Sequence, residues 1–182
     1  VVGLVTRKIF IERMISRQLE EVEAIKKGYS YFQTRDDDDS KEKKPLVWFI
    51  IDEAHNFLPA TGKTAATDSL VTILREGRQP GLSLILITQQ PGKIHTDVLT
   101  QSDIVISHRL TAARDVKALN SMMQSYLGET LTGYINMLPS EPGAAIILDD
   151  NSERLYPMKV RPKFSWHGGE APIAIETKKK EN

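Results

Sequence analysis

An uninterrupted apolar run that ends in two carboxylates is the feature that most constrains how this chain of 182 residues folds. The run covers residues 46–51 and contains β-branched and aromatic side chains, and Asp52 and Glu53 follow it directly. A short run of this kind is typical of a strand that is buried on both faces, as in parallel sheets. Because ligands of open α/β sheets bind beyond the carboxyl ends of the strands, we expect both carboxylates to lie where a ligand binds.

An apolar strand followed by an acidic pair predicts a Walker B element. A nucleotide-hydrolysing site needs one carboxylate to hold hydrated magnesium and a second one to orient and polarise the attacking water. We therefore predict Asp52 as the metal ligand and Glu53 as the catalytic residue. The alternative is a helix cap or a solvated loop charge, and the motifs downstream favour the catalytic interpretation.

The composition predicts a soluble globular domain with its own core, because 40% of the residues are hydrophobic and 26% are charged. The absence of cysteine excludes disulfides and favours an intracellular, cytoplasmic protein, and no apolar run has the length of a membrane span. The formal net charge is zero, so any contact with DNA must be local or come from residues outside this sequence. Since the chain starts at Val1 without a methionine, we expect it to begin inside a longer protein.

Helices and strands are expected to alternate along the rest of the chain. A helix is predicted over residues 4–27, with the apolar stripe Ile11, Ile15, Leu19 and Val22 as its core face. Further helices are predicted over residues 68–76, 112–127 and 129–137, and strands over residues 82–88, 103–107, 144–148 and 154–160. Residues 34–44 form a charged link to which we assign no function. Gly62-Lys63-Thr64 is rejected as a phosphate loop, because that motif needs a glycine where Phe57 stands.

Three polar residues lie beside the other predicted strands. Gln89 follows the strand over residues 82–88, where an amide can hydrogen-bond both a phosphate oxygen and a water. Arg78 lies in the turn before that strand, where it could otherwise cap helix carbonyls or pair with Glu76. Arg109 lies just beyond the third strand.

These motifs together resemble the C-terminal part of HerA-type ATPases, in the HerA/FtsK group of hexameric DNA pumps. The resemblance rests on Asp52-Glu53-Ala54-His55, Arg75-Glu76-Gly77-Arg78, Thr88-Gln89-Gln90-Pro91 and His167-Gly168-Gly169. It covers nearly all of the chain and is weakest over residues 28–44. DEAH-box RNA helicases share the first motif, but the arginine turn and the Thr-Gln strand end do not fit that group.

The resemblance implies a fold class, namely an incomplete RecA-like P-loop NTPase sheet. This α/β sheet is expected to be mostly parallel, flanked by helices, and followed by a C-terminal β extension and a tail. Residues 1–160 would be the C-terminal portion of the ATPase domain, and residues 161–182 a tail over the subunit interface. The family's Walker A loop and its N-terminal barrel are not in this sequence and would precede Val1. A central strand would therefore be missing, which leaves exposed sheet edges.

The same resemblance implies the cofactors ATP and Mg²⁺ and a role for each site residue. Asp52 matches the Walker B magnesium carboxylate, Glu53 the catalytic glutamate and Gln89 the sensor. Arg78 matches an arginine finger that reaches the adjacent subunit, and Arg109 a recurrent arginine that we assign to cofactor binding. The implied partners are double-stranded DNA, further copies of the chain in a hexameric ring, and a NurA-type nuclease in DNA end resection and repair; no membrane is implied.

Two alternatives stay open. The chain could belong to a conjugation-type or other ATPase of the same superfamily that pumps protein or single-stranded DNA. It could also be non-catalytic and only oligomerise through an exposed sheet edge. The sequence upstream of Val1 would distinguish a HerA-type ATPase from the first alternative. A nucleotide titration with a sizing experiment would distinguish it from the second.

Overall fold

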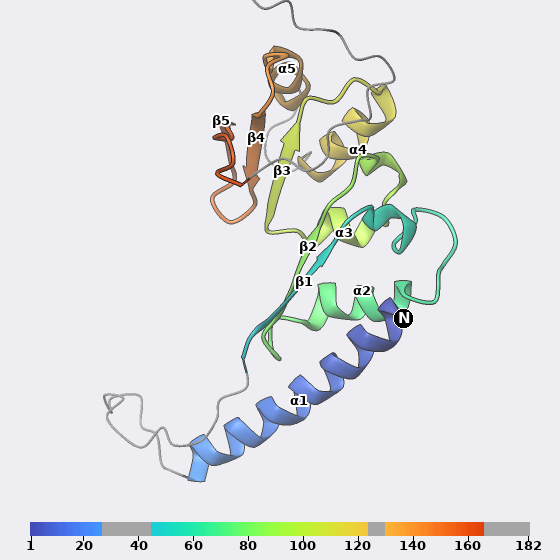
Figure 1. The fold of residues 1–182 in the computed structure, drawn as a ribbon, viewed down its shortest axis with the longest axis vertical. Helices are drawn as coiled ribbons and strands as arrows, with labels where there is room; N and C mark the ends of the chain where they lie inside the picture. The colour runs from blue at the N-terminus through green and yellow to red at the C-terminus, as the bar shows by residue number, and fades with distance from the viewer. Residues whose placement is uncertain (27–44, 124–129, 166–182) are drawn as a thin grey trace, which may run out of the picture.

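A computed structural model describes residues 1–26, 45–123 and 130–165 of the chain (Figure 1). The charged link over residues 34–44 and most of the expected tail lie outside the described residues. In chain order the elements are α1 (Val2–Lys26), β1 (Val47–Ile51), η1 (Ala54–Asn56), α2 (Thr67–Glu76), β2 (Leu82–Leu86), η2 (Pro91–Lys93), α3 (Thr96–Thr100), β3 (Ile104–His108), α4 (Ala113–Met123), α5 (Thr130–Met137), β4 (Ala144–Asp149) and β5 (Arg154–Lys159). Each helix and strand predicted above therefore exists, with bounds that differ by a few residues. The protein has a mixed α/β fold.

β1 and β2 form a parallel pair whose carboxyl ends lie side by side. Ile51 pairs with Leu86 at this end, and Val47 pairs with Leu82 at the other. The backbone pairing continues past the strands, because Ile87 N donates to Ile51 O over 2.9 Å and Ala54 N donates to Ile87 O over 2.9 Å. The residues that follow the two strands are thereby held next to one another, as the predicted site requires.

Helices α2 and α3 cover one face of this pair. Leu70 of α2 and Val98 of α3 are buried with Ile51, and Leu84 and Leu86 pack against the same cluster. Burial of each such side chain contributes about 1.5–3 kcal/mol relative to an exposed one. This cluster packs against the carboxyl ends of β1 and β2.

The opposite face of β1 is not covered by the described residues. Trp48 is 62% exposed and Ile50 is 67% exposed, whereas Ile51 is buried. The prediction that this strand is buried on both faces is therefore wrong for the described residues. The apolar run specifies a strand that suits burial on both faces, but only α2 and α3 pack against it here.

The second sheet has the order β3-β4-β5 and is antiparallel throughout. The expectation of a mostly parallel sheet is wrong for the described residues, which contain one parallel pair and two antiparallel ones. The tight turn between β4 and β5 explains part of the difference, because a short connection can only join antiparallel strands. Within that turn the Ser152 hydroxyl donates to Asp149, which lowers the pKa of this carboxyl.

Helices α4 and α5 complete the core of this second unit, which lies at the end of the molecule away from α1 (Figure 1). Leu119 of α4 and Ile135 of α5 are buried against Ile146 and Leu148 of β4. β5 is an edge strand that contains Pro157, and an edge is where a sheet tolerates proline.

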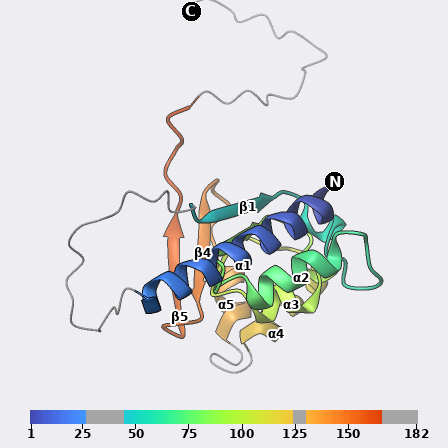
Figure 2. The same ribbon diagram turned by 90° about the horizontal axis from the view of Figure 1, so that it is seen from below.

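Helix α1 lies alongside α2, but it does not use the predicted face (Figure 2). Its buried residues are Thr6, Arg13 and Ser16, whereas the stripe Ile11, Ile15, Leu19 and Val22 is 47–61% exposed. The prediction of a core face is wrong for the described residues, because α1 docks through small and hydrogen-bonding groups. A Cβ atom at Gly3 would lie 2.5 Å from Ala65 O, and Arg13 Nε donates to Pro80 O over 2.8 Å. Among the described residues, no helix has the length and apolar character needed to cross a membrane.

Candidate active site

The predicted catalytic pair Glu53 and Gln89 meets at the carboxyl ends of β1 and β2. Gln89 Nε2 donates to Glu53 Oε1 over 2.8 Å, although the two residues are 36 positions apart in the sequence. This contact follows from the parallel pairing, which places the first residues after each strand at the same edge. The structure thus brings together the predicted water-orienting carboxylate and the predicted sensor amide.

Glu53 has a left-handed backbone conformation, with φ 49° and ψ 46°. Asp52 Oδ1 accepts the Glu53 N–H over 2.8 Å and so stabilises this turn. A non-glycine residue in this conformation costs about 1 kcal/mol or more, and such residues cluster at functional sites. The turn directs the Glu53 carboxylate toward the end of β2, where Gln89 binds it.

His55 and Thr88 also belong to this site, although sequence reasoning assigned no role to either. His55 Nδ1 lies 3.0 Å from Thr88 Oγ1 and 3.4 Å from Glu53 Oε2. Thr88 Oγ1 additionally accepts the Gln90 N–H over 3.0 Å. Both residues belong to the family motifs named above. The sequence signals that could have identified them are a histidine two positions after the glutamate and a threonine directly before the sensor amide.

The site fits a magnesium ion that arrives with a nucleotide, and it does not fit a metal held by protein ligands alone. Asp52 is exposed at the strand end. The described residues contain no group of three or more histidine, aspartate or glutamate side chains that could hold a metal. Magnesium usually keeps several waters and is bound by one or two carboxylates together with substrate phosphates. Asp52 satisfies the protein's share of that requirement.

Arg78 lies at the opposite end of the β1–β2 pair from Glu53. It precedes β2, whose first residue Leu82 pairs with Val47 at the start of β1. Five strand residues span roughly 16 Å. The exposed Arg78 side chain makes no hydrogen bond or ion pair within the described residues. The structure therefore does not bring Arg78 to the site of its own chain.

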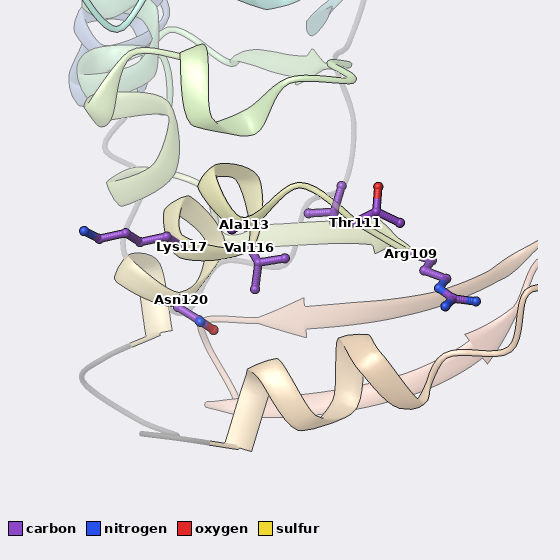
Figure 3. A pocket seen from close by; sticks show the side chains of 7 residues that line it. Arg109, Thr111, Ala113, Val116, Lys117 and Asn120 are labelled. Atoms are coloured by element: carbon purple, nitrogen blue, oxygen red, sulfur yellow. The ribbon is translucent and has the colours of Figure 1, made fainter.

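Arg109 lines an open pocket of about 500 Å³ beside α4 (Figure 3). Lys117 and Asn120 of α4 line the same pocket, and Arg109 Nη1 donates to Ser140 Oγ. Neither Glu53 nor Gln89 lines it. Arg109 is thus in a pocket of its own, separate from the strand ends.

A clamp from α4 holds the loop that follows Gln89. Asp115 Oδ1 accepts the Gly92 N–H over 2.9 Å, and Arg114 Nε donates to Gly92 O over 3.0 Å. A Cβ atom at Gly92 would lie 2.7 Å from Arg114 Cγ and 2.9 Å from Asp115 Oδ1. The close approach explains why glycine stands here.

The segment Gly62-Lys63-Thr64, which the sequence analysis rejected as a phosphate loop, makes side-chain contacts with its neighbours in the structure. Thr64 Oγ1 donates to Phe57 O over 2.9 Å, and Lys63 Nζ lies 2.8 Å from Asp68 Oδ1. The segment leads into α2 and does not follow a strand directly.

A comparison with models of known protein families identifies the family of this chain. The model of the helicase HerA-like C-terminal region matches residues 31–138, which is more than half of the 182 residues. The chain belongs to this family. The matched residues contain both strand ends of the candidate site, as the sequence motifs predicted.

Two curated archaeal relatives match part of the chain. The chain is 36% identical over 88 residues to the probable DNA double-strand break repair helicase HerA of Methanocaldococcus jannaschii. The aligned residues cover 48% of this chain and 17% of the relative. It is 30% identical over 122 residues to the DNA double-strand break repair helicase HerA of Pyrococcus furiosus. This alignment covers 63% of this chain and 22% of the relative. The chain therefore spans about a fifth of the length of these relatives.

Solved structures of a viral packaging ATPase share part of the fold. The genome packaging NTPase B204 of Sulfolobus turreted icosahedral virus 2, in complex with AMPPCP, matches with a TM-score of 0.50 and 26% identity, over 62% of this chain and 53% of that chain. Its sulfate complex matches with a TM-score of 0.51 at 24% identity, over 64% and 53% of the two chains, and supports the fold alone. The site geometry thus occurs in a fold that is shared with a nucleotide-binding protein.

Proposed function

We propose that this chain supplies the magnesium and water side of the ATP hydrolysis site in a HerA-like translocase that acts on double-stranded DNA in end resection and repair. The observation that carries the proposal is the Gln89–Glu53 hydrogen bond of 2.8 Å, which joins the predicted sensor to the predicted catalytic carboxylate. The family membership and the names of the archaeal relatives support the DNA-repair context.

In this proposal Asp52 holds the magnesium ion, which neutralises phosphate charge when it is bound. Glu53 orients the attacking water and accepts its proton, and Gln89 links that carboxylate to the γ-phosphate side of the site. Phosphoryl transfer depends mainly on positioning and charge stabilisation, so two strand ends held by backbone pairing suit this chemistry.

The phosphate-cradling part of the site is proposed to come from outside the 182 residues. No Gly-x-x-x-x-Gly-Lys-Ser/Thr motif occurs in the sequence, and the chain spans about a fifth of its relatives. The complete domain is proposed to be RecA-like, with residues 1–160 as its C-terminal portion and residues 161–182 as a tail over the subunit interface.

A ring of subunits, hexameric in the family that the sequence resembles, would complete the site from the neighbouring chain. Arg78 is proposed as the arginine finger, because it lies at the end of β2 remote from its own Glu53. Arg109 is proposed to contact the nucleotide or a neighbouring subunit from its separate pocket. A NurA-type nuclease is the proposed partner of the ring, on the resemblance alone.

Replacement of Glu53 by glutamine tests the proposal in the full-length protein. Glu53→Gln should keep binding of ATP with magnesium, because Asp52 remains, and should lower hydrolysis by about a hundredfold or more through loss of the water-activating base. Steady-state phosphate release and a nucleotide-binding titration measure the two effects. Glu12→Gln is the matched control, because Glu12 is exposed on α1 and lies outside the motifs that carry the candidate site. Wild-type turnover in Glu53→Gln would show that Glu53 is only a loop charge.

A further inference from the structure

We infer that His55 is a positioning residue that orients the Glu53 carboxylate, and that Thr88 fixes the imidazole for this task. The inference rests on the proposed function of Glu53 and adds two residues to it. His55 lies on η1 just after Glu53, whereas Thr88 lies just after β2, so their contact is a second side-chain link between the two strand ends. The Gln89–Glu53 bond is the first such link.

The two oxygens of the Glu53 carboxylate have different surroundings. Oε1 accepts the hydrogen bond from Gln89 Nε2. Oε2 is buried and accepts no hydrogen bond within the described residues. His55 Nδ1 lies 3.4 Å from Oε2. A buried carboxylate oxygen without a donor is unfavourable, so a small rotation that closes this distance is favourable.

The same geometry selects the tautomer of His55. If Nδ1 carries the proton, it can donate to Thr88 Oγ1 at 3.0 Å, and Glu53 Oε2 at 3.4 Å is a second acceptor nearby. If Nδ1 lacks the proton, the Thr88 hydroxyl can donate to it, but its lone pair then faces Glu53 Oε2 with no hydrogen between them. The first arrangement is electrostatically better, so His55 is assigned as an Nδ1–H donor.

Thr88 is suited to hold this donor in place. Its hydroxyl oxygen already accepts the Gln90 N–H over 3.0 Å, which fixes the position of Oγ1. The His55 side chain is only 13% exposed, so few other ring orientations are accessible to it. Gln89, Glu53, His55 and Thr88 therefore form a connected set that orients the carboxylate for its water. Removal of His55 should change the orientation of Glu53 and leave nucleotide binding intact.

Three substitutions of His55 in the full-length protein test the inference. His55→Ala should lower kcat for ATP hydrolysis by about tenfold to a hundredfold, because small misplacements of a catalytic group have effects of this size. KM for ATP should stay unchanged. His55→Asn should recover most of kcat, because the asparagine amide nitrogen lies where Nδ1 lies. His55→Gln should not, because its amide lies near the position of Nε2.

Several outcomes would overturn the inference. Wild-type kcat in His55→Ala, a change confined to KM, or equal recovery by asparagine and glutamine would each show that Nδ1 does not orient Glu53. If His55→Ala fails to fold, Thr88→Val gives the same test, with Thr88→Ser as the control that keeps the hydroxyl. The valine variant should lose kcat and the serine variant should keep it, and equal kcat in the two would reject the inference.

The same assays separate this inference from the proposed function. If Glu53→Gln is inactive while His55→Ala turns over at the wild-type rate, the proposed function stands and the role of His55 is rejected. If Glu53→Gln itself turns over at the wild-type rate, both are rejected.

Discussion

Glu53 owes its orientation to its own backbone and to neighbours from two segments of the chain. The left-handed turn aims the side chain, Asp52 accepts the Glu53 N–H, and Gln89 and His55 lie at the two carboxylate oxygens. At the scale of single residues, the site is thus a set of short polar contacts between the ends of two strands. Such contacts position groups for phosphoryl transfer, in which the protein contributes mostly orientation and charge.

Arg78 is the residue whose proposed role depends on a second copy of the chain. Because it lies at the other end of β2 from Gln89, we expect it to act in the site of an adjacent subunit. In the full-length protein, Arg78→Ala should leave nucleotide affinity nearly intact and lower turnover by about a thousandfold, the effect of removing an arginine finger. A binding titration and a phosphate-release assay measure these quantities.

Mixing of variants tests whether Arg78 acts across the subunit boundary. Rings assembled from Arg78→Ala and Glu53→Gln subunits contain some sites with both groups intact, so mixing should restore part of the activity. Verified mixing without any recovery would show that Arg78 serves its own subunit or only the fold.

At the scale of elements, α4 connects the second unit to the candidate site. Its residues Arg114 and Asp115 bind both the N–H and the C=O of Gly92, three positions after Gln89. The loop that carries the sensor is therefore held by a helix that also packs in the core of the β3-β4-β5 unit.

Replacement of Gly92 by alanine tests this clamp. The new Cβ atom would lie under 3.0 Å from both Arg114 Cγ and Asp115 Oδ1, so one of the two hydrogen bonds should break. We expect Gly92→Ala to lower the free energy of unfolding by about 1–3 kcal/mol, as overpacking does. Chemical denaturation measures the loss. Gly133→Ala in α5 is the control, because a Cβ atom there meets nothing within 4 Å, and equal stability of the two variants would contradict the clamp.

At the scale of the whole molecule, several large apolar side chains of the described residues remain exposed. Trp48 and Ile50 on the free face of β1 are 62% and 67% exposed, and Leu19 and Ile25 on α1 are 61% and 79% exposed. Both edges of the two-stranded sheet also lack a strand partner within the described residues. Apolar surface and open edges of this kind promote association.

We therefore expect the isolated 182-residue chain to self-associate and to hydrolyse no ATP above background. The first expectation follows from the exposed face and edges, and the second from the missing phosphate-cradling motif. Light scattering and a phosphate-release assay on the purified chain, beside Glu53→Gln, test both. Ile50→Lys should reduce association, because it places a charge on the exposed face. A monomeric chain would contradict the first expectation, and Glu53-dependent turnover would contradict the second.

Much of the architecture was predictable because its signals are local. The apolar run before Asp52 and the run before Gln89 are β1 and β2, and the periodic segment over residues 68–76 is α2. Turn residues such as Gly77, Pro80 and Gly81 mark the boundary between α2 and β2. The family resemblance predicted that Glu53 and Gln89 belong to one site, whereas the hydrogen bond between them was found only in the structure.

Tertiary structure decided which faces of these elements are buried. The stripe of α1 that includes Ile15 has the spacing of a core face, yet α1 docks through Thr6, Arg13 and Ser16. Hydrophobic spacing specifies that a face is apolar, but what covers that face depends on which other elements are present to pack on it. For the same reason β1 is covered on one face only, by α2 and α3.

The sequence by itself determined where the elements lie and which residues carry the family motifs, because each of these signals lies in residues that are close together along the chain. The acidic pair and the sensor amide are predictions that rest on those motifs. Only the tertiary structure decided that His55 reaches Thr88, that α4 holds Gly92, and that Arg78 is remote from its own Glu53. Those relations depend on distances between segments that are 20 or more residues apart. No local pattern encodes such distances, because they are set by how strands pair and helices pack.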